Sequence, residues 1–178
     1  MPSALPYRVA TLIYIFDRED RALLIRRARE PNRGLWSPPG GKLKVDIGES
    51  PHMCAARETR EETGLALAPA DFHLTGLIGE RAYQGQTHWL MFLFEARVRL
   101  DRTPPPHKEG PFAFVAREAL GDRPLPDSDR RWVWPAFWAH RGGFFSAYLE
   151  YDENGEGRWT LEQSMKASNF LKNETPGA

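Results

Sequence analysis

Apolar residues dominate both sides of the first segment of the chain. Residues 7–16 are predicted to form a strand, in which successive side chains point to opposite sides. The two sides of this strand would carry Tyr7, Val9, Thr11, Ile13 and Ile15 against Leu12, Tyr14 and Phe16. A polar turn at 17–20 precedes a second strand at 22–25, and further strands are predicted at 72–80, 87–100, 112–115, 144–151 and 158–163. The last two would form a hairpin around Asn154-Gly155, a favoured type I′ pair.

One segment has the pattern of a well-capped helix. Ser50 is a good N-cap, Pro51 suits the first helical position and Gly64 is a natural stop, with no helix breaker across 53–63. Shorter helical pieces are predicted at 116–120 and, around an aromatic cluster with Pro135, at 129–140. This strand–helix–strand order predicts an α/β fold.

Length and charge limit the classes of protein that fit. The chain has 178 residues, which suggests one domain, and we place that domain at 1–163 with a polar tail at 164–178. Its 24 basic and 24 acidic residues argue against a nucleic-acid coat or a polybasic membrane protein. The longest apolar run, 89–94, is too short to span a bilayer, so a cytoplasmic location is expected. The single cysteine, Cys54, excludes an intrachain disulfide and is interpreted as a small buried hydrophobe.

Three carboxylates share one face of the predicted helix. Glu58, Glu61 and Glu62 lie at i, i+3 and i+4, where like charges repel one another. A solvated face relieved by nearby arginines is one interpretation. The other is compensation by divalent cations, since clustered oxygen ligands suit Mg²⁺ or Mn²⁺. The upstream pair Gly40-Gly41 would let backbone atoms approach the same ions or phosphates.

A longer pattern contains these residues. The run Gly41-x7-Glu49-x7-Arg57-Glu58-Thr59-x-Glu61-Glu62-x-Gly64-Leu65 resembles the Nudix box, G-x5-E-x7-R-E-U-x-E-E-x-G-U, where U is a bulky aliphatic residue. Two extra residues lie between the first glycine and glutamate, and threonine stands at one aliphatic position. The resemblance extends over about 7–163 with falling specificity.

The resemblance implies a fold, an activity and a metal site. The fold would be the Nudix α/β/α sandwich, a mixed curved sheet flanked by helices. The activity would be hydrolysis of a nucleoside diphosphate linked to another group, with Mg²⁺ or Mn²⁺ as cofactor. The metal ligands implied are Gly40 through its carbonyl, Glu58, Glu61, Glu62 and, by likeness of Lys108-Glu109-Gly110 to MutT-like members, Glu109. Glu58, Glu61 and Glu62 are the catalytic candidates, with the general base left open, and Glu49 and Arg57 are expected to form a structural ion pair.

Likeness to the nucleotide-sanitising members suggests where a substrate would bind. Arg27, Trp36 and Ser37 match phosphate- and base-facing positions, although a strand arginine is more often a salt-bridge partner. Asp129, with Asp127 second, matches an acidic group that binds the purine edge in 8-oxo-dGTP diphosphatases, although an aspartate at a helix start is usually a cap. Serine at position 37 replaces the amide or carboxylate of those enzymes and weakens the likeness. The three tryptophans of the 129–140 segment are interpreted mainly as core residues.

The expected function is Mg²⁺-dependent hydrolysis of a nucleoside triphosphate, including an oxidised purine such as 8-oxo-dGTP, to the monophosphate and pyrophosphate. The alternatives are a hydrolase of ADP-ribose or of dinucleotide polyphosphates, and a non-catalytic nucleotide sensor. Retention of all three helix glutamates argues against the sensor. The expected partner is a nucleotide or related small molecule, with no nucleic-acid polymer and no membrane, and a homodimer is one assembly that the sequence permits.

Overall fold

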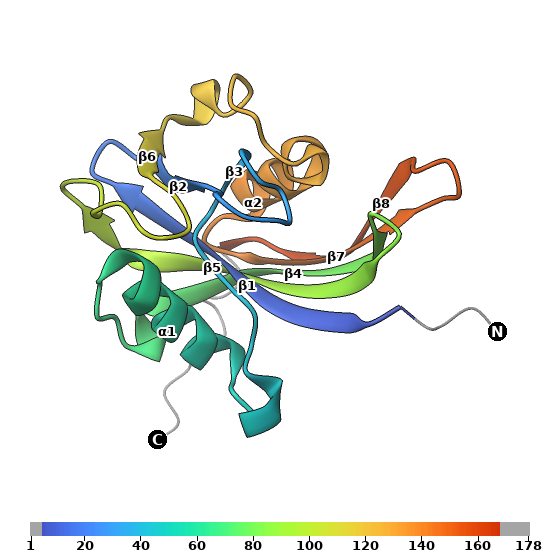
Figure 1. The fold of residues 1–178 in the computed structure, drawn as a ribbon, viewed down its shortest axis with the longest axis horizontal. Coiled ribbons are helices and arrows are strands. Elements are labelled where there is room, and N and C mark those ends of the chain that lie inside the picture. Colours follow the sequence, from blue (N-terminus) through green and yellow to red (C-terminus); the bar gives the residue numbers. More distant parts are fainter. Residues whose placement is uncertain (1–4, 168–178) are drawn as a thin grey trace.

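A mixed sheet of eight strands runs through residues 5–167, the part of the chain that the computed structural model describes (Figure 1). The strand order is β3-β2-β1-β5-β4-β7-β8, and β6 also pairs with β2. The β1–β5 and β4–β7 pairs are parallel and the others are antiparallel. The strands are β1 Tyr7–Asp17, β2 Ala22–Arg26, β3 Trp36–Ser37, β4 Phe72–Tyr83, β5 Thr87–Leu100, β6 Phe112–Val115, β7 Phe144–Tyr151 and β8 Gly157–Met165.

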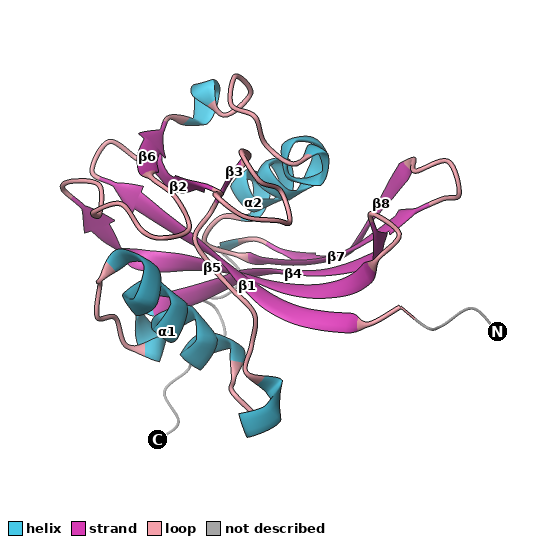
Figure 2. Ribbon diagram, viewed as in Figure 1, coloured by secondary structure: helices cyan, strands magenta, loops and turns pink. Residues whose placement is uncertain are grey.

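Helices lie on both faces of this sheet (Figure 2). Helix α1, Pro51–Thr63, begins where the Ser50 side chain accepts a hydrogen bond from the Met53 amide at 3.2 Å, and it ends at Gly64 in the left-handed conformation. The shorter helix α2, Trp134–His140, packs on the opposite face (Figure 1). Single helical turns complete the list: η1 Val45–Ile47, η2 Pro69–Asp71, η3 Arg117–Ala119 and η4 Asp129–Val133. The predicted sandwich is therefore confirmed.

The alternation in β1 divides the core into two layers. Ile13 and Ile15 pack with Ala55 of α1 on one face of the sheet. Tyr14 and Phe16 pack with α2 on the other, where the Tyr14 and Phe137 rings stack with centroids 3.8 Å apart. Because β1 is covered on both faces, it is apolar at nearly every position.

Several predicted boundaries differ from the structure. The 129–140 segment is helical throughout, but it begins as the π-helical turn η4 and becomes α-helical only at Trp134. Strand β4 continues beyond the predicted end at 80 as far as Tyr83, and β8 continues through Ser164 and Met165, which pair with β7. The start of the predicted tail at 164 therefore lies in the sheet, and its last eleven residues, 168–178, lie outside the described part of the chain.

The predicted type I′ turn of the β7–β8 hairpin is wrong. The turn instead spans 152–155, with the Gly155 amide donating to the Asp152 carbonyl at 3.0 Å, and only Gly155 has a positive φ. The cause is the Asp152 carboxylate, which accepts hydrogen bonds from the amides of Asn154 and Glu156 at 2.8 and 2.9 Å. This side chain stabilises a turn one residue earlier.

None of the helices in residues 5–167 has the length and apolar character needed to cross a bilayer.

Candidate active site

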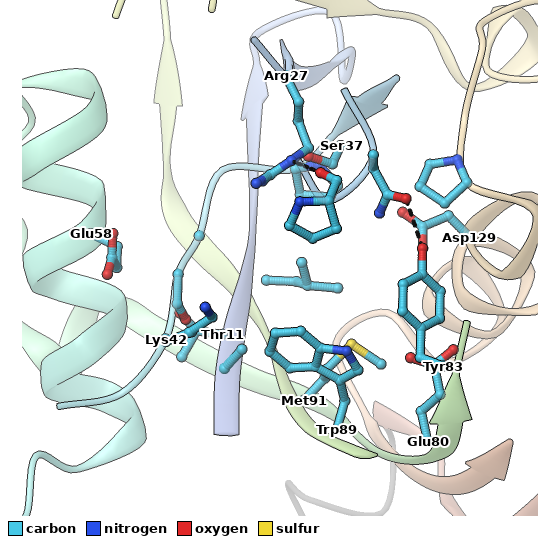
Figure 3. A pocket seen from close by; sticks show the side chains of 18 of the residues that line it. Thr11, Arg27, Ser37, Lys42, Glu58, Glu80, Tyr83, Trp89, Met91 and Asp129 are labelled. Carbon is cyan, nitrogen blue, oxygen red and sulfur yellow. Dashed lines mark hydrogen bonds between the residues drawn. The ribbon is translucent and has the colours of Figure 1, made fainter. Parts of the chain in front are cut away.

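A cavity of about 440 Å³ opens beside the loop that contains Gly40 and Gly41, called the glycine loop below (Figure 3). The sheet and the loops that follow β2 and precede η4 form its other walls. This volume lies within the usual range for small-molecule sites, about 300–1,000 Å³. Glu58 lies at one end and Asp129 at the other, with Trp89 and Met91 on the wall between them. The cavity thus has two acidic ends joined by an apolar stretch.

The glycine loop is held against β1. The amides of Thr11 and Ile13 donate to the carbonyls of Gly41 and Pro39, each at 2.8 Å. Gly40 has a φ of +149°, and a Cβ there would overlap the Thr11 carbonyl. A Cβ on Gly41 would overlap the Glu58 carboxylate. Position 40 therefore needs glycine, because a Cβ there would meet the backbone of β1, whereas a side chain at position 41 would displace the Glu58 carboxylate.

Glu58, Glu62 and Glu109 gather beside this loop. Burial raises the pKa of Glu62 to about 8, with further contributions from Glu109 and Glu58, and the Gly40 amide donates to Glu62 Oε2 at 3.0 Å. Burial also raises the pKa of Glu58, which feels Glu61 and Glu109. The Glu109 loop is fixed to β2, since the Ala28 amide donates to the Glu109 carbonyl at 2.7 Å. The predicted Lys-Glu-Gly glutamate thus lies with the helix carboxylates.

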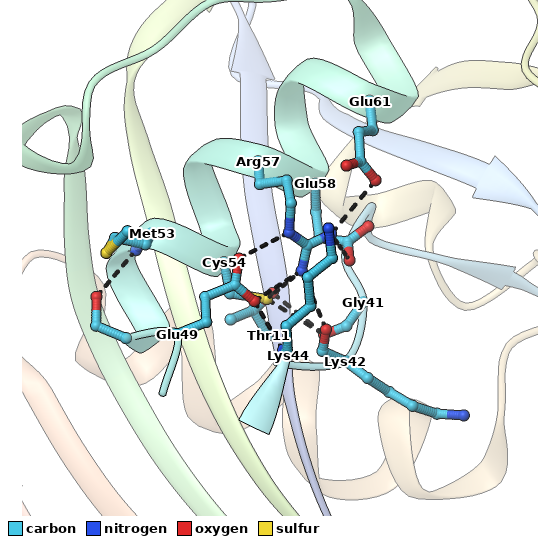
Figure 4. Close-up of polar contacts among 11 residues, drawn as sticks. Thr11, Gly41, Lys42, Lys44, Glu49, Met53, Cys54, Arg57, Glu58 and Glu61 are labelled. Carbon is cyan, nitrogen blue, oxygen red and sulfur yellow. Dashed lines mark hydrogen bonds and ion pairs between the residues drawn. The ribbon is translucent and has the colours of Figure 1, made fainter. Parts of the chain in front are cut away.

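Glu61 differs from its two helix neighbours. Its side chain is 54% exposed, and Oε2 lies 3.3 Å from Arg57 Nη1 (Figure 4). Glu61 is absent from the cavity wall, whereas Glu58 is on it. Helix α1 therefore directs Glu58 into the cavity, buries Glu62 under the glycine loop and leaves Glu61 at the rim.

The predicted ion pair between Glu49 and Arg57 is formed and largely buried. Arg57 Nε and Nη2 donate to the two Glu49 oxygens at 2.7 and 2.9 Å, and the Glu49 side chain is only 5% exposed (Figure 4). The hydrogen bonds from Arg57 hold the pKa of Glu49 down at about 2. Arg57 also donates to the Lys42 carbonyl at 3.1 Å and to Glu58 at 2.6 Å. The segment between Gly41 and Glu49, which is two residues longer than in the usual box, projects outward around η1, where Val45 and Ile47 are exposed. The Glu49–Arg57 pair therefore forms despite the longer segment.

The acidic end fits a divalent cation by its donor set. Glu58 and Glu62, whose pKa values are raised mainly by burial and further by neighbouring carboxylates, form with the glycine backbone an all-oxygen environment, which suits Mg²⁺ or Mn²⁺. Among residues 5–167, no three His, Cys, Asp or Glu side chains are already arranged as a metal site. Arg57 instead occupies an oxygen of Glu58 and one of Glu61.

Three of the four residues predicted to bind substrate line the cavity, and one does not. Arg27, Ser37 and Asp129 line the cavity, and the buried Ser37 hydroxyl has no hydrogen-bond partner in the described chain. Arg27 Nε donates to the Pro31 carbonyl at 2.8 Å. Trp36 does not line the cavity: it packs against the core layer of α2, with the Arg123 guanidinium 5.5 Å from its ring centroid. Consecutive strand residues point to opposite sides, so Trp36 and Ser37 cannot both face the same cavity.

Sequence reasoning missed part of the cavity wall. Glu80 and Tyr83 of β4 and Trp89 and Met91 of β5 all line it. Glu80 pairs directly with Trp89 across the two strands, so the two side chains share a face. The sequence signal was the glutamate that follows the mostly apolar run 76–79 in this strand. Tyr83 in turn donates a hydrogen bond to Asn32 Oδ1 at 2.7 Å, which joins the loop after β2 to the sheet.

Comparison with known proteins shows what the chain is similar to. The RNA pyrophosphohydrolase of Gluconobacter oxydans (strain 621H) is 32% identical over 140 residues, 70% of this chain and 80% of that protein. The MutT NUDIX hydrolase of Burkholderia pseudomallei is 31% identical, with a TM-score of 0.57 over 70% of this chain and 93% of its own. The mutator MutT protein of Bacillus halodurans shares the fold, with 23% identity and a TM-score of 0.68 over 87% of this chain and 97% of its own.

A family model provides the assignment. The model of the NUDIX domain matches residues 6–134, which include the glycine loop, α1, Glu109 and Asp129. The relatives are named as pyrophosphohydrolases or Nudix hydrolases, which act on phosphoric anhydrides. This chain is a hydrolase that belongs to the Nudix family.

Proposed function

We propose that this protein is a Mg²⁺-dependent pyrophosphohydrolase that converts a nucleoside triphosphate into the monophosphate and pyrophosphate. The observation that supports this most directly is the single cavity that has Glu58 at one end and Asp129 at the other, with Ser37 and Glu109 also on its wall. Arg27 lies on the wall of the same cavity. A triphosphate directed to the carboxylates would leave its base among the polar groups at the far end.

Each part of the acidic end has a role in this proposal. Glu58, Glu62, Glu109 and the Gly40 carbonyl would hold the cation, and Glu61 at the rim would bind a further ion or take the proton from water. Mg²⁺ when bound neutralises phosphate charge and lowers the pKa of a coordinated water. Arg27 contributes positive charge toward the phosphates, and the Glu49–Arg57 pair keeps the glycine loop against α1. Proton transfer to a positioned carboxylate is worth roughly 10²–10⁴-fold in rate.

A second candidate substrate is the triphosphate end of an RNA. It is favoured by the Gluconobacter oxydans relative, whose name is RNA pyrophosphohydrolase. The bond broken would be of the same class, but the 3′ side of the first nucleotide would have to leave the cavity. The two candidates therefore differ in what lies beyond the first sugar, not in the chemistry at α1.

A panel of substrates tests the proposal. The protein is incubated with Mg²⁺ and dGTP, 8-oxo-dGTP, ATP, ADP-ribose, a diadenosine polyphosphate or a 5′-triphosphorylated RNA oligonucleotide, and the products are separated by ion-exchange chromatography. Pyrophosphate released from free triphosphates is the expected result. Cleavage of ADP-ribose alone would overturn the proposal, and cleavage of the RNA alone would favour the second candidate. Metal-dependent binding without turnover would identify a sensor.

A further inference from the structure

The loop between β2 and β3, residues 27–35, contributes to the cavity wall. Arg27, Pro31 and Asn32 of this loop all line the cavity. The loop closes on itself, since the Arg27 amide donates to the Leu35 carbonyl at 2.9 Å and the Gly34 amide donates to the Arg27 carbonyl at 2.7 Å. These internal hydrogen bonds make the loop a unit that can keep its own shape while its position over the cavity changes.

The tip of this loop, residues 29–33, has one hydrogen bond to a residue outside the loop within the part of the chain that the structure describes. The Tyr83 hydroxyl at the end of β4 donates to Asn32 Oδ1 at 2.7 Å, the bond drawn dashed beside Tyr83 in Figure 3. Burial raises the pKa of Tyr83, so its hydroxyl keeps its proton and remains a donor near neutral pH. Arg29, Glu30 and Arg33 are exposed and form no ion pair within residues 5–167. A single hydrogen bond thus fastens the tip to the sheet.

Left-handed backbone lies on both sides of this hydrogen bond. Four non-glycine residues of the described chain have a positive φ, and three of them are Asn32 at +66°, Ala82 at +57° and Gln84 at +50°. Asparagine tolerates this conformation, whereas alanine and glutamine adopt it at a cost in energy. The turn is held in place by the Ala82 amide, which donates to His88 Nδ1 at 3.0 Å. Such strain clusters at ligand clamps and other functional sites, which points to a role for the Tyr83 contact beyond stability.

The same contact reaches the arginine of the cavity wall. Arg27 Nε donates to the Pro31 carbonyl at 2.8 Å, and Pro31 immediately precedes Asn32. The guanidinium of Arg27 is thus braced by the tip of the loop, and the tip is held by Tyr83. Opening of the Tyr83–Asn32 contact would move the Pro31 carbonyl and remove the acceptor that orients Arg27. A hydroxyl on β4 therefore controls the direction of a positive charge on the β2–β3 loop.

We propose that Tyr83 is a positioning residue whose hydroxyl fastens the tip of the β2–β3 loop and so holds Arg27 in the direction from which it binds phosphate; this role rests on the proposed function, which assigns Arg27 to the phosphates of a nucleotide. Tyr83 acts through the loop and needs no contact with the phosphates. Loss of its hydroxyl leaves the charge of Arg27 in place but frees the loop and the guanidinium. Phosphate binding then has to order both, which weakens it.

Limited digestion with trypsin measures the position of the loop without any ligand. Trypsin can cleave the exposed tip after Arg29 and Arg33, and it can cleave after Arg102 on the exposed bend that follows β5. Tyr83→Phe removes only the hydroxyl and should speed cleavage at the tip by about 3- to 10-fold, the factor that loss of one hydrogen bond gives. Cleavage after Arg102 is the internal reference and should change by less than about 2-fold. The matched control is Tyr148→Phe on β7, half-buried and off the cavity wall, which should behave like the unmodified protein at all of these sites.

Calorimetric binding of imidodiphosphate with Mg²⁺ tests the effect on Arg27. This diphosphate carries no base, and it resists hydrolysis because nitrogen replaces its bridging oxygen. Tyr83→Phe should weaken its binding by about 3- to 10-fold while the Tm stays close to that of the unmodified protein. Arg27→Gln should weaken binding by at least about 10-fold. The double variant should bind no more weakly than Arg27→Gln alone, because a residue that acts through Arg27 has no effect once Arg27 is removed.

Unchanged cleavage at the tip in Tyr83→Phe would overturn the inference, because the hydroxyl would then not fasten the loop. Losses of imidodiphosphate binding that add in the double variant would overturn it too, since they would show that Tyr83 acts independently of Arg27. Absence of binding to the unmodified protein would have the same consequence.

Neither measurement requires turnover, so both are separate from the substrate panel. Faster cleavage at the tip and non-additive binding losses, with no substrate found in the panel, would contradict the proposed function and support the role of Tyr83. Turnover of triphosphates with unchanged cleavage at the tip would do the reverse.

Discussion

At the scale of single residues, Glu58 and Glu62 occupy different environments within one turn of α1. Glu58 faces the cavity, and Glu62 is buried under the Gly40 amide. We predict that Glu58→Gln and Glu62→Gln each lower kcat for the substrate that the panel identifies by at least ~10²-fold, the scale of a positioned catalytic group. Gln retains an oxygen that can accept from Gly40, so the fold should be kept. Steady-state kinetics checks this, with Glu162→Gln on exposed β8 as the control; rates like those of the control in either variant would refute the metal assignment.

Glu49 gives a prediction on pH and stability. Its pKa lies below the ordinary value because of Arg57, so the pair stabilises the fold fully above the unfolded pKa of about 4.3 and loses this contribution as pH falls toward about 2. Glu49→Gln should lower the free energy of unfolding by about 1–3 kcal/mol at pH 7, and the difference should shrink below about pH 4.3. Urea unfolding of both proteins at several pH values measures this. A difference that stays constant down to pH 2 would contradict it.

At the scale of elements, α1 carries the acidic side chains, so its N-terminal cap affects the site. The Ser50 hydroxyl accepts from the Met53 amide, which otherwise has no partner within the helix. Ser50→Ala should reduce the free energy of unfolding by about 1 kcal/mol, the usual cost of losing such a cap. Urea denaturation provides the value, and Ser164→Ala on exposed β8 is the control, expected within about 0.5 kcal/mol of the unmodified protein. Equal losses in the two variants would show that the cap contributes nothing.

Local signals account for the elements that the sequence predicted well. The caps Ser50 and Gly64 bounded α1 to the residue, and the two sides predicted for the first strand match the two faces of β1. The resemblance to the Nudix box predicted the Glu49–Arg57 pair, whose partners lie on one loop and one helix close in sequence.

Features that depend on distant pairing were not predictable in this way. Trp36 belongs to a strand of only two residues, too short for a periodic pattern to give its orientation. Glu80 meets Trp89 through the register between β4 and β5, which includes bulges that shift the pairing. The hairpin turn depends on one carboxylate, Asp152, that overrides the preference of the Asn-Gly pair. The end of the cavity that Glu80 and Trp89 line is thus a product of sheet register.

At the scale of the whole molecule, equal numbers of acidic and basic residues hide a separation of charge. The segment 21–33 has five arginines and one glutamate, whereas four glutamates, Glu49, Glu58, Glu61 and Glu62, lie on α1 and its approach. The structure gives these arginines different roles. Arg21 pairs with buried Asp17 at 2.6 Å, and Arg27 lines the cavity. Within this segment, Arg27 is therefore the arginine that lines the cavity, whereas Arg21 stabilises the β1–β2 turn.

Arg141 joins three distant parts of the fold. It follows α2, donates to both oxygens of Asp20 in the β1–β2 turn at 2.6 and 2.7 Å, and donates to Glu95 of β5 at 2.8 Å. Its guanidinium also lies 4.0 Å from the centroid of the Phe16 ring. A planar fork is needed for paired hydrogen bonds and for stacking, and the ammonium of lysine has neither property. The side chains of Arg141 and Glu95 are 19% and 13% exposed, so water screens their contact only weakly, whereas Asp20 is 54% exposed.

We therefore predict that Arg141→Lys lowers the free energy of unfolding by about 1–3 kcal/mol although it preserves the charge. The matched control is Arg158→Lys, whose side chain is 77% exposed on the β7–β8 hairpin and whose ion pair with Glu150 should contribute less than about 1 kcal/mol. Urea unfolding with an unchanged m-value measures both, because neither change alters the surface exposed on unfolding. If the two variants lost the same stability, charge alone would explain both contacts. A larger loss at Arg141 would show that its geometry ties α2 to the turn and to β5, and so holds the two layers of the core together around the sheet.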